Sequence, residues 1–168
     1  MNWEQFSQIA QIFEGITVLV AVIFGFVQFR QYKQQRRDTA AIELMHSLQD
    51  VETIRAMRLV FSLPEGISLE EVRAKGEKYE DAAYAISANL ETICLTVHRK
   101  NIPAELVEEL IGGAIVALWK KLRTWAADYR AEQGHPYFWE WFQWMATRFE
   151  EHGRTAQPPA YERNPKIQ

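Results

Sequence analysis

The residues best suited to chemistry in this chain are a single cysteine, four histidines and carboxylates at helical spacing. Glu91, Cys94 and His98 are separated by three and four residues, which places them on one face of a helix. Thiolate, imidazole and carboxylate groups are the usual ligands of zinc. A lone cysteine beside apolar residues is, however, more typical of a helix core. We therefore expect Cys94 to be a core residue and the histidines, His98 included, to be surface or capping groups.

Glu43 and His46 have the Glu-x-x-His spacing of di-iron helical bundles. Such a centre needs this motif twice, and the other candidate pair, Glu132 and His135, is interrupted by Gly134. A glycine-rich phosphate loop, a nucleophile elbow and an HExxH motif are all absent from the sequence. We predict no metal site, no cofactor and no catalytic residue, and hence a protein that is not an enzyme. A membrane-tethered metalloenzyme is the disfavoured alternative.

The strongest pattern in the chain is the apolar run from Ile9 to Phe29. Thirteen of its 21 residues are Ile, Leu, Val or Phe, and Glu14 is its only charge. As a helix this run is about 31 Å long, enough to cross the hydrocarbon core of a bilayer. A secretory signal peptide is the competing interpretation, but Glu4 stands where such a peptide is basic, and no small-residue cleavage site follows. We predict a retained single-pass transmembrane helix within residues 1–37.

Four basic residues, Arg30, Lys33, Arg36 and Arg37, follow the apolar run directly. The positive-inside rule then places the N-terminus outside and the body in the cytoplasm, at a bacterial inner (plasma) membrane. These cations also suit contact with lipid headgroups. The net charge of the whole chain is −3, so the body that follows this basic segment is acidic. An acidic body excludes nucleic acid as an expected partner.

One face of the predicted transmembrane helix carries its polar and small residues. Close approach of small side chains and hydrogen bonds between polar ones hold membrane helices together, so this face predicts a homo-oligomer. A monomeric anchor is one alternative, and an ion-conducting pore with rings of Gln11 and Glu14 is another. The residues of this stripe alternate at spacings of three and four: Gln11, Glu14, Val18, Ala21, Gly25 and Gln28.

The residues after the membrane segment predict an all-α fold. We expect the transmembrane helix to continue without a break into a cytoplasmic antiparallel helical bundle, residues 38–152, because no Pro or Gly occurs between Arg30 and Pro64. A second cytoplasmic helix is expected to begin at a capping box formed by Ser68 and Glu71 and to end near residue 100. Residues 153–168 predict an extended or disordered tail.

Two further helices complete the predicted bundle. One runs from about Pro103 to Arg130 and contains Gly112 and Gly113, which we expect to permit close packing. The other runs from about residue 137 to residue 151 and is rich in aromatic residues. The residues expected in the core include Ile86, Leu90, Ile93, Leu110 and Trp119.

Two tryptophans of the last helix, Trp139 and Trp144, do not follow its predicted apolar stripe. Exposed tryptophans are typical of protein-binding surfaces. We therefore interpret Trp139 and Trp144 as a possible surface for another membrane or cytoplasmic protein.

Three segments of the chain form a distinctive set: residues 99–113, residues 119–122 and residues 140–144. These segments resemble a bacterial membrane-anchored family described as a domain of unknown function (DUF family 4760). The resemblance spans about residues 3 to 150 and implies the same architecture, but no activity, cofactor or catalytic residue. The sequence thus predicts a single-pass membrane protein that acts as a scaffold or regulatory interaction module.

Overall fold

The computed structural model describes residues 20, 22–32, 34–35, 39, 42–44, 46, 48–152, 158 and 162, and throughout these residues the regular structure is helical. The fold is therefore all-α, as predicted. The chain divides into two units, Met1–Thr39 and Ala40–Gln168. The second unit contains the helices α2 (Val51–Phe61), α3 (Leu69–Lys75), α4 (Glu77–His98), α5 (Ala104–Val107), the π-helical turn η1 (Glu108–Gly112), α6 (Gly113–Gln133) and α7 (Glu140–His152).

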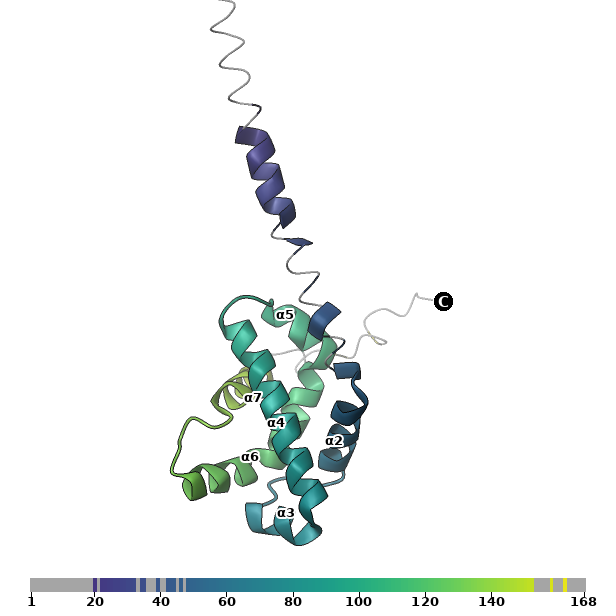
Figure 1. Ribbon diagram of the computed structural model, residues 1–168, viewed down its shortest axis with the longest axis vertical. Coiled ribbons are helices and arrows are strands. Elements are labelled where there is room, and N and C mark those ends of the chain that lie inside the picture. Colours follow the sequence, from purple (N-terminus) through teal and green to yellow (C-terminus); the bar gives the residue numbers. More distant parts are fainter. Residues whose placement is uncertain are drawn as a thin grey trace, which may run out of the picture. The chain divides into compact units, whose positions relative to one another are not determined.

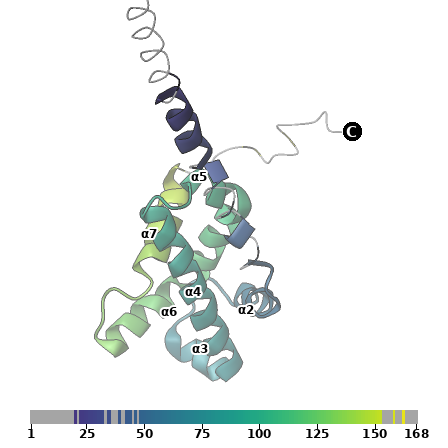
Figure 2. The same cartoon turned by 45° about the horizontal axis from the view of Figure 1, so that its top comes forward.

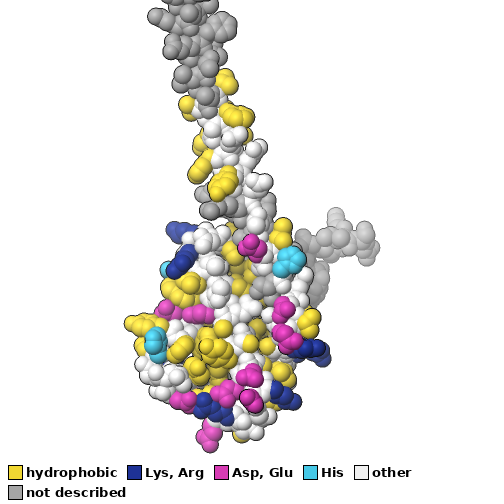
Figure 3. Space-filling view, viewed as in Figure 1, with side chains coloured by type: hydrophobic (Ala, Val, Ile, Leu, Met, Phe, Trp, Pro, Cys, Tyr) yellow, Lys and Arg dark blue, Asp and Glu magenta, His cyan; other side chains and the backbone are white. Residues whose placement is uncertain are grey.

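In the first unit, residues 22–32 form a helix whose apolar side chains have no cover. Seven large apolar side chains between Val20 and Phe29 are 44% to 67% exposed, and they appear as yellow atoms along this helix in Figure 3. Within the described residues, no helix meets the length and hydropathy that a membrane crossing requires. Residues 9–19 and 21 of the predicted transmembrane run lie outside the described residues.

Helix α4 is the central element of the second unit. It packs against α2, α3 and α7, and both views of the ribbon show it between α2 and α7 (Figures 1 and 2). Ile86, Leu90 and Ile93 on α4 are buried, as is Trp119 on α6, which confirms four of the five core residues predicted from helical spacing. The fifth, Leu110, is 40% exposed, so that prediction is wrong. Leu110 lies in the π-helical turn η1, whose wider turn shifts the residues out of the 3.6-residue period.

The predicted continuous first helix is interrupted at Asp50. The backbone of Asp50 is extended, and its carboxylate accepts hydrogen bonds from the N–H groups of Glu52 and Thr53 at 3.1 Å. The first N–H groups of a helix have no acceptor within the helix, and the residue whose side chain caps them is the one that precedes the helix. Asp50 therefore starts a new helix, α2, although no Pro or Gly marks the boundary.

The capping box at Ser68 is confirmed. The Ser68 hydroxyl accepts a hydrogen bond from the Glu71 N–H at 3.2 Å, and the Glu71 carboxylate accepts one from the Ser68 N–H at 2.9 Å. The helix that it opens is only α3, because Gly76 adopts φ +109°, a conformation that side-chain-bearing residues rarely adopt. The predicted single helix to residue 100 is thus two helices, α3 and α4. Similarly, α7 begins at Glu140 rather than near residue 137.

Helix α3 and the turn before it are fastened to α6. The Gly66 N–H donates to the Lys120 carbonyl at 2.9 Å, and the Leu69 N–H donates to the Asp128 carboxylate at 3.0 Å. Asp128 thereby satisfies a free N–H at the start of α3 from a helix 59 residues away. The turn at Pro64–Gly66 and α3 therefore form one layer with α6.

The two adjacent glycines differ in their surroundings. Gly112 is buried, and a Cβ atom there would lie 3.0 Å from Cγ of Glu108 and 3.6 Å from Cδ2 of Phe149. At Gly113 a Cβ atom would meet nothing within 4 Å. The expected close packing is therefore present at Gly112 and absent at Gly113.

We predict that Gly113→Ala raises the free energy of unfolding by about 0.5–1 kcal/mol, because alanine favours the helix and finds open space. Gly112→Ala should give a smaller gain or a loss, since Glu108 and Phe149 must shift to admit the methyl group. Thermal unfolding of the full chain, followed by circular dichroism, measures both variants. An equal gain at the two positions would contradict the packing assigned to Gly112.

Candidate functional site

The start of α7 is held by a carboxylate from α4. Glu91 accepts hydrogen bonds from the backbone N–H of Phe142 at 2.8 Å and of Trp141 at 3.3 Å. It therefore serves as an N-terminal cap from a neighbouring helix, where the helix dipole favours negative charge. Burial raises the pKa of the Glu91 carboxyl, whereas the two backbone hydrogen bonds oppose this rise. Glu91 is thus engaged in structure and is not directed at a metal.

Arg130 on α6 holds the other side of the same junction. Its Nε donates to the Phe138 carbonyl at 2.7 Å, and its Nη1 donates to Oε1 of Gln143 at 2.8 Å. Burial lowers the pKa of this guanidinium, and the charges of Glu91 and Glu140 partly offset that effect. Arg130 was not identified from the sequence. It connects the loop before α7 to the first turn of α7, so these segments are positioned together.

Trp139 points into the core of this junction, so the prediction that it forms an exposed partner surface is wrong. Its side chain is only 4% exposed, and its ring centroid lies 5.2 Å from that of Tyr84 and 6.0 Å from that of Trp125. Trp139 precedes the first residue of α7 and has φ +60°, so helical spacing does not determine its direction. A left-handed backbone turns this tryptophan inward instead.

Trp144 is the tryptophan that reaches the surface, although it is half-buried rather than fully exposed. Its ring lies 5.5 Å from that of His98 and 6.2 Å from that of Trp141, and the Arg148 guanidinium lies 5.8 Å from its centroid. His98 in turn lies over Trp141 at 4.1 Å between centroids. These contacts form a mixed aromatic and cationic surface at the junction of α4 and α7.

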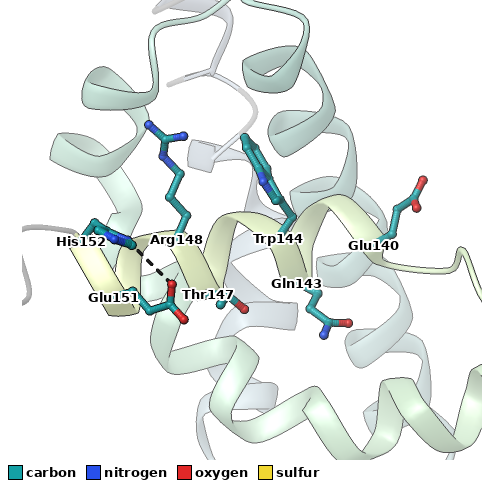
Figure 4. A pocket seen from close by; sticks show the side chains of 7 residues that line it. All are labelled: Glu140, Gln143, Trp144, Thr147, Arg148, Glu151 and His152. Carbon is teal, nitrogen blue, oxygen red and sulfur yellow. Dashed lines mark ion pairs between the residues drawn. The ribbon is translucent and has the colours of Figure 1, made fainter.

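The surface around Trp144 is hollowed along α7. We refer to its lining residues as the α7 face, and the open hollow along them has a volume of about 680 Å³. In Figure 4, Trp144 and Arg148 project from one side of the helix, and Gln143, Thr147 and Glu151 project from the other. Among the described residues the lining comes from α7 alone: Glu140, Gln143, Trp144, Thr147, Arg148, Glu151 and His152.

The metal-type spacing on α4 does not converge in space. Glu91 caps α7, His98 contacts Trp141, and Cys94 is buried between them, where burial raises the pKa of its thiol. A raised pKa disfavours the thiolate that metal binding requires. In the part of the chain that the structure describes, no three His, Cys, Asp or Glu side chains are grouped to hold a metal ion.

A second hollow, of about 370 Å³, lies between α2 and α4. Its apolar residues are Ala56 and Leu59 of α2 and Ala82, Ala85 and Ile86 of α4. Two acidic and two basic residues, Glu52, Arg55, Lys78 and Asp81, also line it. Glu52 and Arg55 already pair with each other at 2.6 Å. The described lining of this hollow therefore has balanced charges and small apolar side chains, and unlike the α7 face it contains no aromatic side chain.

The predicted membrane stripe is only partly described. Gly25 and Gln28 lie on the helix of residues 22–32 and Arg30 follows on the same helix, whereas Gln11, Glu14, Val18 and Ala21 lie outside the described residues. Lys33, Arg36 and Arg37 also lie outside them. At Gly25 a Cβ atom would meet nothing within 4 Å in the single chain. This glycine is therefore not required by packing within the described part of the chain.

We predict that burial of Glu91 makes stability depend on pH. Because the pKa of Glu91 is raised in the folded state, its contribution is present below the ordinary glutamate range and is lost as pH rises through the raised value. Glu91→Gln keeps an acceptor for the Phe142 N–H and removes this titration. The difference in unfolding free energy between the wild type and Glu91→Gln should therefore fall with rising pH in thermal unfolding series. The matched control is Glu70→Gln, an exposed side chain on α3; equal changes in both variants would refute the assignment.

Comparison with known proteins places these features in a family. No curated protein and no solved structure matches the chain significantly. A family profile described as Domain of unknown function (DUF4760) matches residues 15–149, a range that includes Glu91, Arg130 and Trp144. This match covers most of the chain and confirms the resemblance found from the sequence. The chain therefore belongs to the DUF4760 family.

Proposed function

We propose that this protein is a single-pass membrane adaptor without enzymatic activity. Its N-terminus lies outside a bacterial inner membrane, its helical body lies in the cytoplasm, and it acts as a homo-oligomeric scaffold or regulatory interaction module. The observation that carries the proposal is the row of uncovered apolar side chains between Val20 and Phe29. A helix with this much exposed apolar surface requires a lipid or protein environment. Lipid is favoured because the apolar sequence extends from Ile9, and Arg30 follows at its end.

Three of the groups with perturbed pKa values, Glu91, Cys94 and Arg130, lie near the junction of α4, α6 and α7. Such groups often mark active sites. Here, however, Glu91 caps α7 and Cys94 is packed in the core, and Arg130 holds the loop before α7. Each group therefore has a structural role that accounts for its environment.

The α7 face supports binding to a cytoplasmic protein. Tryptophan and arginine are the residues most enriched at energetically important positions of interfaces, and Trp144 and Arg148 are neighbours here. The hydrogen bonds of Glu91 and Arg130 hold the start of α7 in place, so little ordering is required on binding. We propose that this face recruits the partner of the adaptor.

The membrane part of the proposal predicts an effect of one glycine. The full chain is expected in the membrane fraction, with a C-terminal reporter active in the cytoplasm. Gly25→Leu should weaken the oligomer more than Phe24→Leu, because Gly25 lies on the small-residue stripe and its substitution meets no obstacle within the described chain. Size measurement in nanodiscs tests this. If the wild type is a monomer, or if both variants remain equally oligomeric, the stripe is not the interface.

The cytoplasmic part of the proposal predicts a loss of partner binding. Trp144→Ala should reduce the amount of partner captured by cross-linking in native membranes at least tenfold. Arg148→Glu, an exposed charge reversal on the same face, should also reduce it and is less able to disturb folding. The control is Tyr137→Ala, which removes a 64% exposed aromatic side chain outside the α7 face. Undiminished capture by both α7 variants would exclude this face as the binding site.

A further inference from the structure

Trp139 has a backbone conformation that its position in the chain does not favour. It directly precedes α7, and its carbonyl accepts a hydrogen bond from the Gln143 N–H at 3.0 Å. A residue before a helix is normally extended, and its side chain normally accepts a hydrogen bond from the first turn. Trp139 instead has φ +60°, and its indole is only a donor. Large side chains rarely adopt this conformation, so the neighbours of Trp139 must impose it.

The other described non-glycine residue with positive φ provides a contrast. Lys100 has φ +59° and follows the end of α4, where its N–H donates to the Val97 carbonyl at 2.8 Å. A left-handed residue is common at the end of a helix, because it closes the last turn. Trp139 lies at the start of a helix, where this explanation does not apply.

The buried ring of Trp139 also lacks a hydrogen-bond partner. Within the described residues, three buried side-chain nitrogen and oxygen atoms have none: Nε1 of Trp139, Nε1 of Trp125 and Oγ of Ser87. Trp125 stacks on Trp139 at 6.0 Å between centroids, and Ser87 lies one turn after Tyr84, whose ring is 5.2 Å from that of Trp139. A buried donor without an acceptor destabilises the buried state. The unpaired atoms therefore gather where α4 and α6 meet the start of α7.

Arg130 offsets these unfavourable effects by holding the chain on both sides of Trp139. Its Nε donates to the carbonyl of the preceding residue, Phe138, and its Nη1 donates to the side chain of Gln143. The N–H of Gln143 is in turn bonded to the Trp139 carbonyl. An unfavourable backbone conformation persists only where the surrounding contacts enforce it. Arg130 is therefore a clamp that keeps Trp139 in place.

The route from this site to solvent is short. Tyr84, which borders the ring of Trp139, is 45% exposed, and residues 134–137 are all exposed. The connection between α6 and α7 lies at the edge of the second unit in both views (Figures 1 and 2). On leaving, the indole N–H gains water and the backbone leaves the left-handed region, whereas the ring contacts and the hold of Arg130 are lost. Because these effects oppose each other, an open state with a population of about 0.1–10% is expected.

We propose that Trp139 is a releasable latch for α7. In the closed state its ring lies against Trp125 and Tyr84, as in the structure. In the open state the ring leaves this site and the first turn of α7 loosens, so Trp144, which begins the second turn, is no longer held for partner binding. Release thereby switches off the α7 face. This regulatory role rests on the function proposed above, whereas the movement itself does not.

Fluorine NMR of the full-length protein in nanodiscs tests the movement. The six tryptophans are replaced by 5-fluorotryptophan during expression, and the variants Trp139→Phe and Trp125→Phe assign two of the resonances. Saturation transfer should show that the Trp139 resonance exchanges with a minor, water-exposed state. Trp125 loses its stacking partner in that state, so its resonance should exchange at the same rate.

Two variants on α6 separate release from general loosening of the body. Arg130→Met keeps the apolar part of the side chain and removes the clamp, so the open population should rise about tenfold, the effect of losing one hydrogen bond from a charged donor. The matched control is Asp128→Ala, which removes the acceptor that holds α3 and should leave the exchange unchanged. Absence of exchange in both the wild type and Arg130→Met would overturn the proposal. An equal rise in the two variants would also overturn it, because Trp139 would then leave only when the body unfolds.

Partner capture in native membranes tests the regulatory role. Trp139→Gly mimics the open state, because it removes the ring and glycine tolerates φ +60°. This variant should lower capture as Trp144→Ala does, and Arg130→Met, which retains the ring, should lower it by a smaller amount. Circular dichroism verifies that each variant is folded.

The two measurements fail independently. If exchange is present but neither Trp139→Gly nor Arg130→Met lowers capture, while Trp144→Ala does, the function holds and the regulatory role is excluded. If Trp144→Ala lowers capture and no exchange is found, the function holds and the latch does not exist. If exchange is present and Trp144→Ala leaves capture unchanged, the movement stands and the proposed function fails.

Discussion

The hydrogen bonds from the first turn of α7 to the Glu91 carboxylate determine where the aromatic surface lies. A helix that begins after a loop has several backbone N–H groups without partners, and α4 supplies the missing acceptors to Phe142 and Trp141. Because this carboxylate is half-buried, its ionised form is disfavoured by lost hydration and favoured by the two N–H donors. Arg130 adds contacts on the other side. The direction of α7, and with it the position of Trp144, follows from these contacts together with the burial of Phe142, Met145, Ala146 and Phe149.

The same device recurs on α6. Asp128 accepts a hydrogen bond from the N-terminus of α3, as Glu91 does from that of α7. In both cases a carboxylate on a long helix caps the N-terminus of a shorter helix that is far away in the sequence. Short helices are marginal on their own, so their stability comes from such tertiary contacts and from burial. The long helices α4 and α6 therefore serve as the scaffold, and α3 and α7 are placed upon them.

The two units have different physical requirements. The helix of residues 22–32 presents apolar side chains all along its described length, and lipid is the environment that satisfies them in the proposed function. The described body buries a core of apolar residues and presents polar groups together with some aromatic ones, among them Trp144 on α7. In the proposed function, the first unit anchors the protein in the membrane and the second unit binds the partner protein. The acidic excess of the body is consistent with a protein partner rather than a nucleic acid.

The sequence by itself determined the helical class, the capping box at Ser68 and the burial of Ile86, Leu90, Ile93 and Trp119. These features depend on local propensity or on regular helical spacing, both of which are readable from neighbouring residues. Only the tertiary structure decided that Leu110 is exposed, that Trp139 is buried, and that α2 begins after Asp50. Predicting burial from helical spacing assumes that one regular helix continues through the segment. A π-helical turn at Leu110, a left-handed backbone at Trp139 and a side-chain cap at Asp50 each interrupt that regular spacing. The roles of Glu91 and Arg130 were equally hidden, because their hydrogen-bond partners lie 50 and 8 residues away and meet only when α4, α6 and α7 pack together.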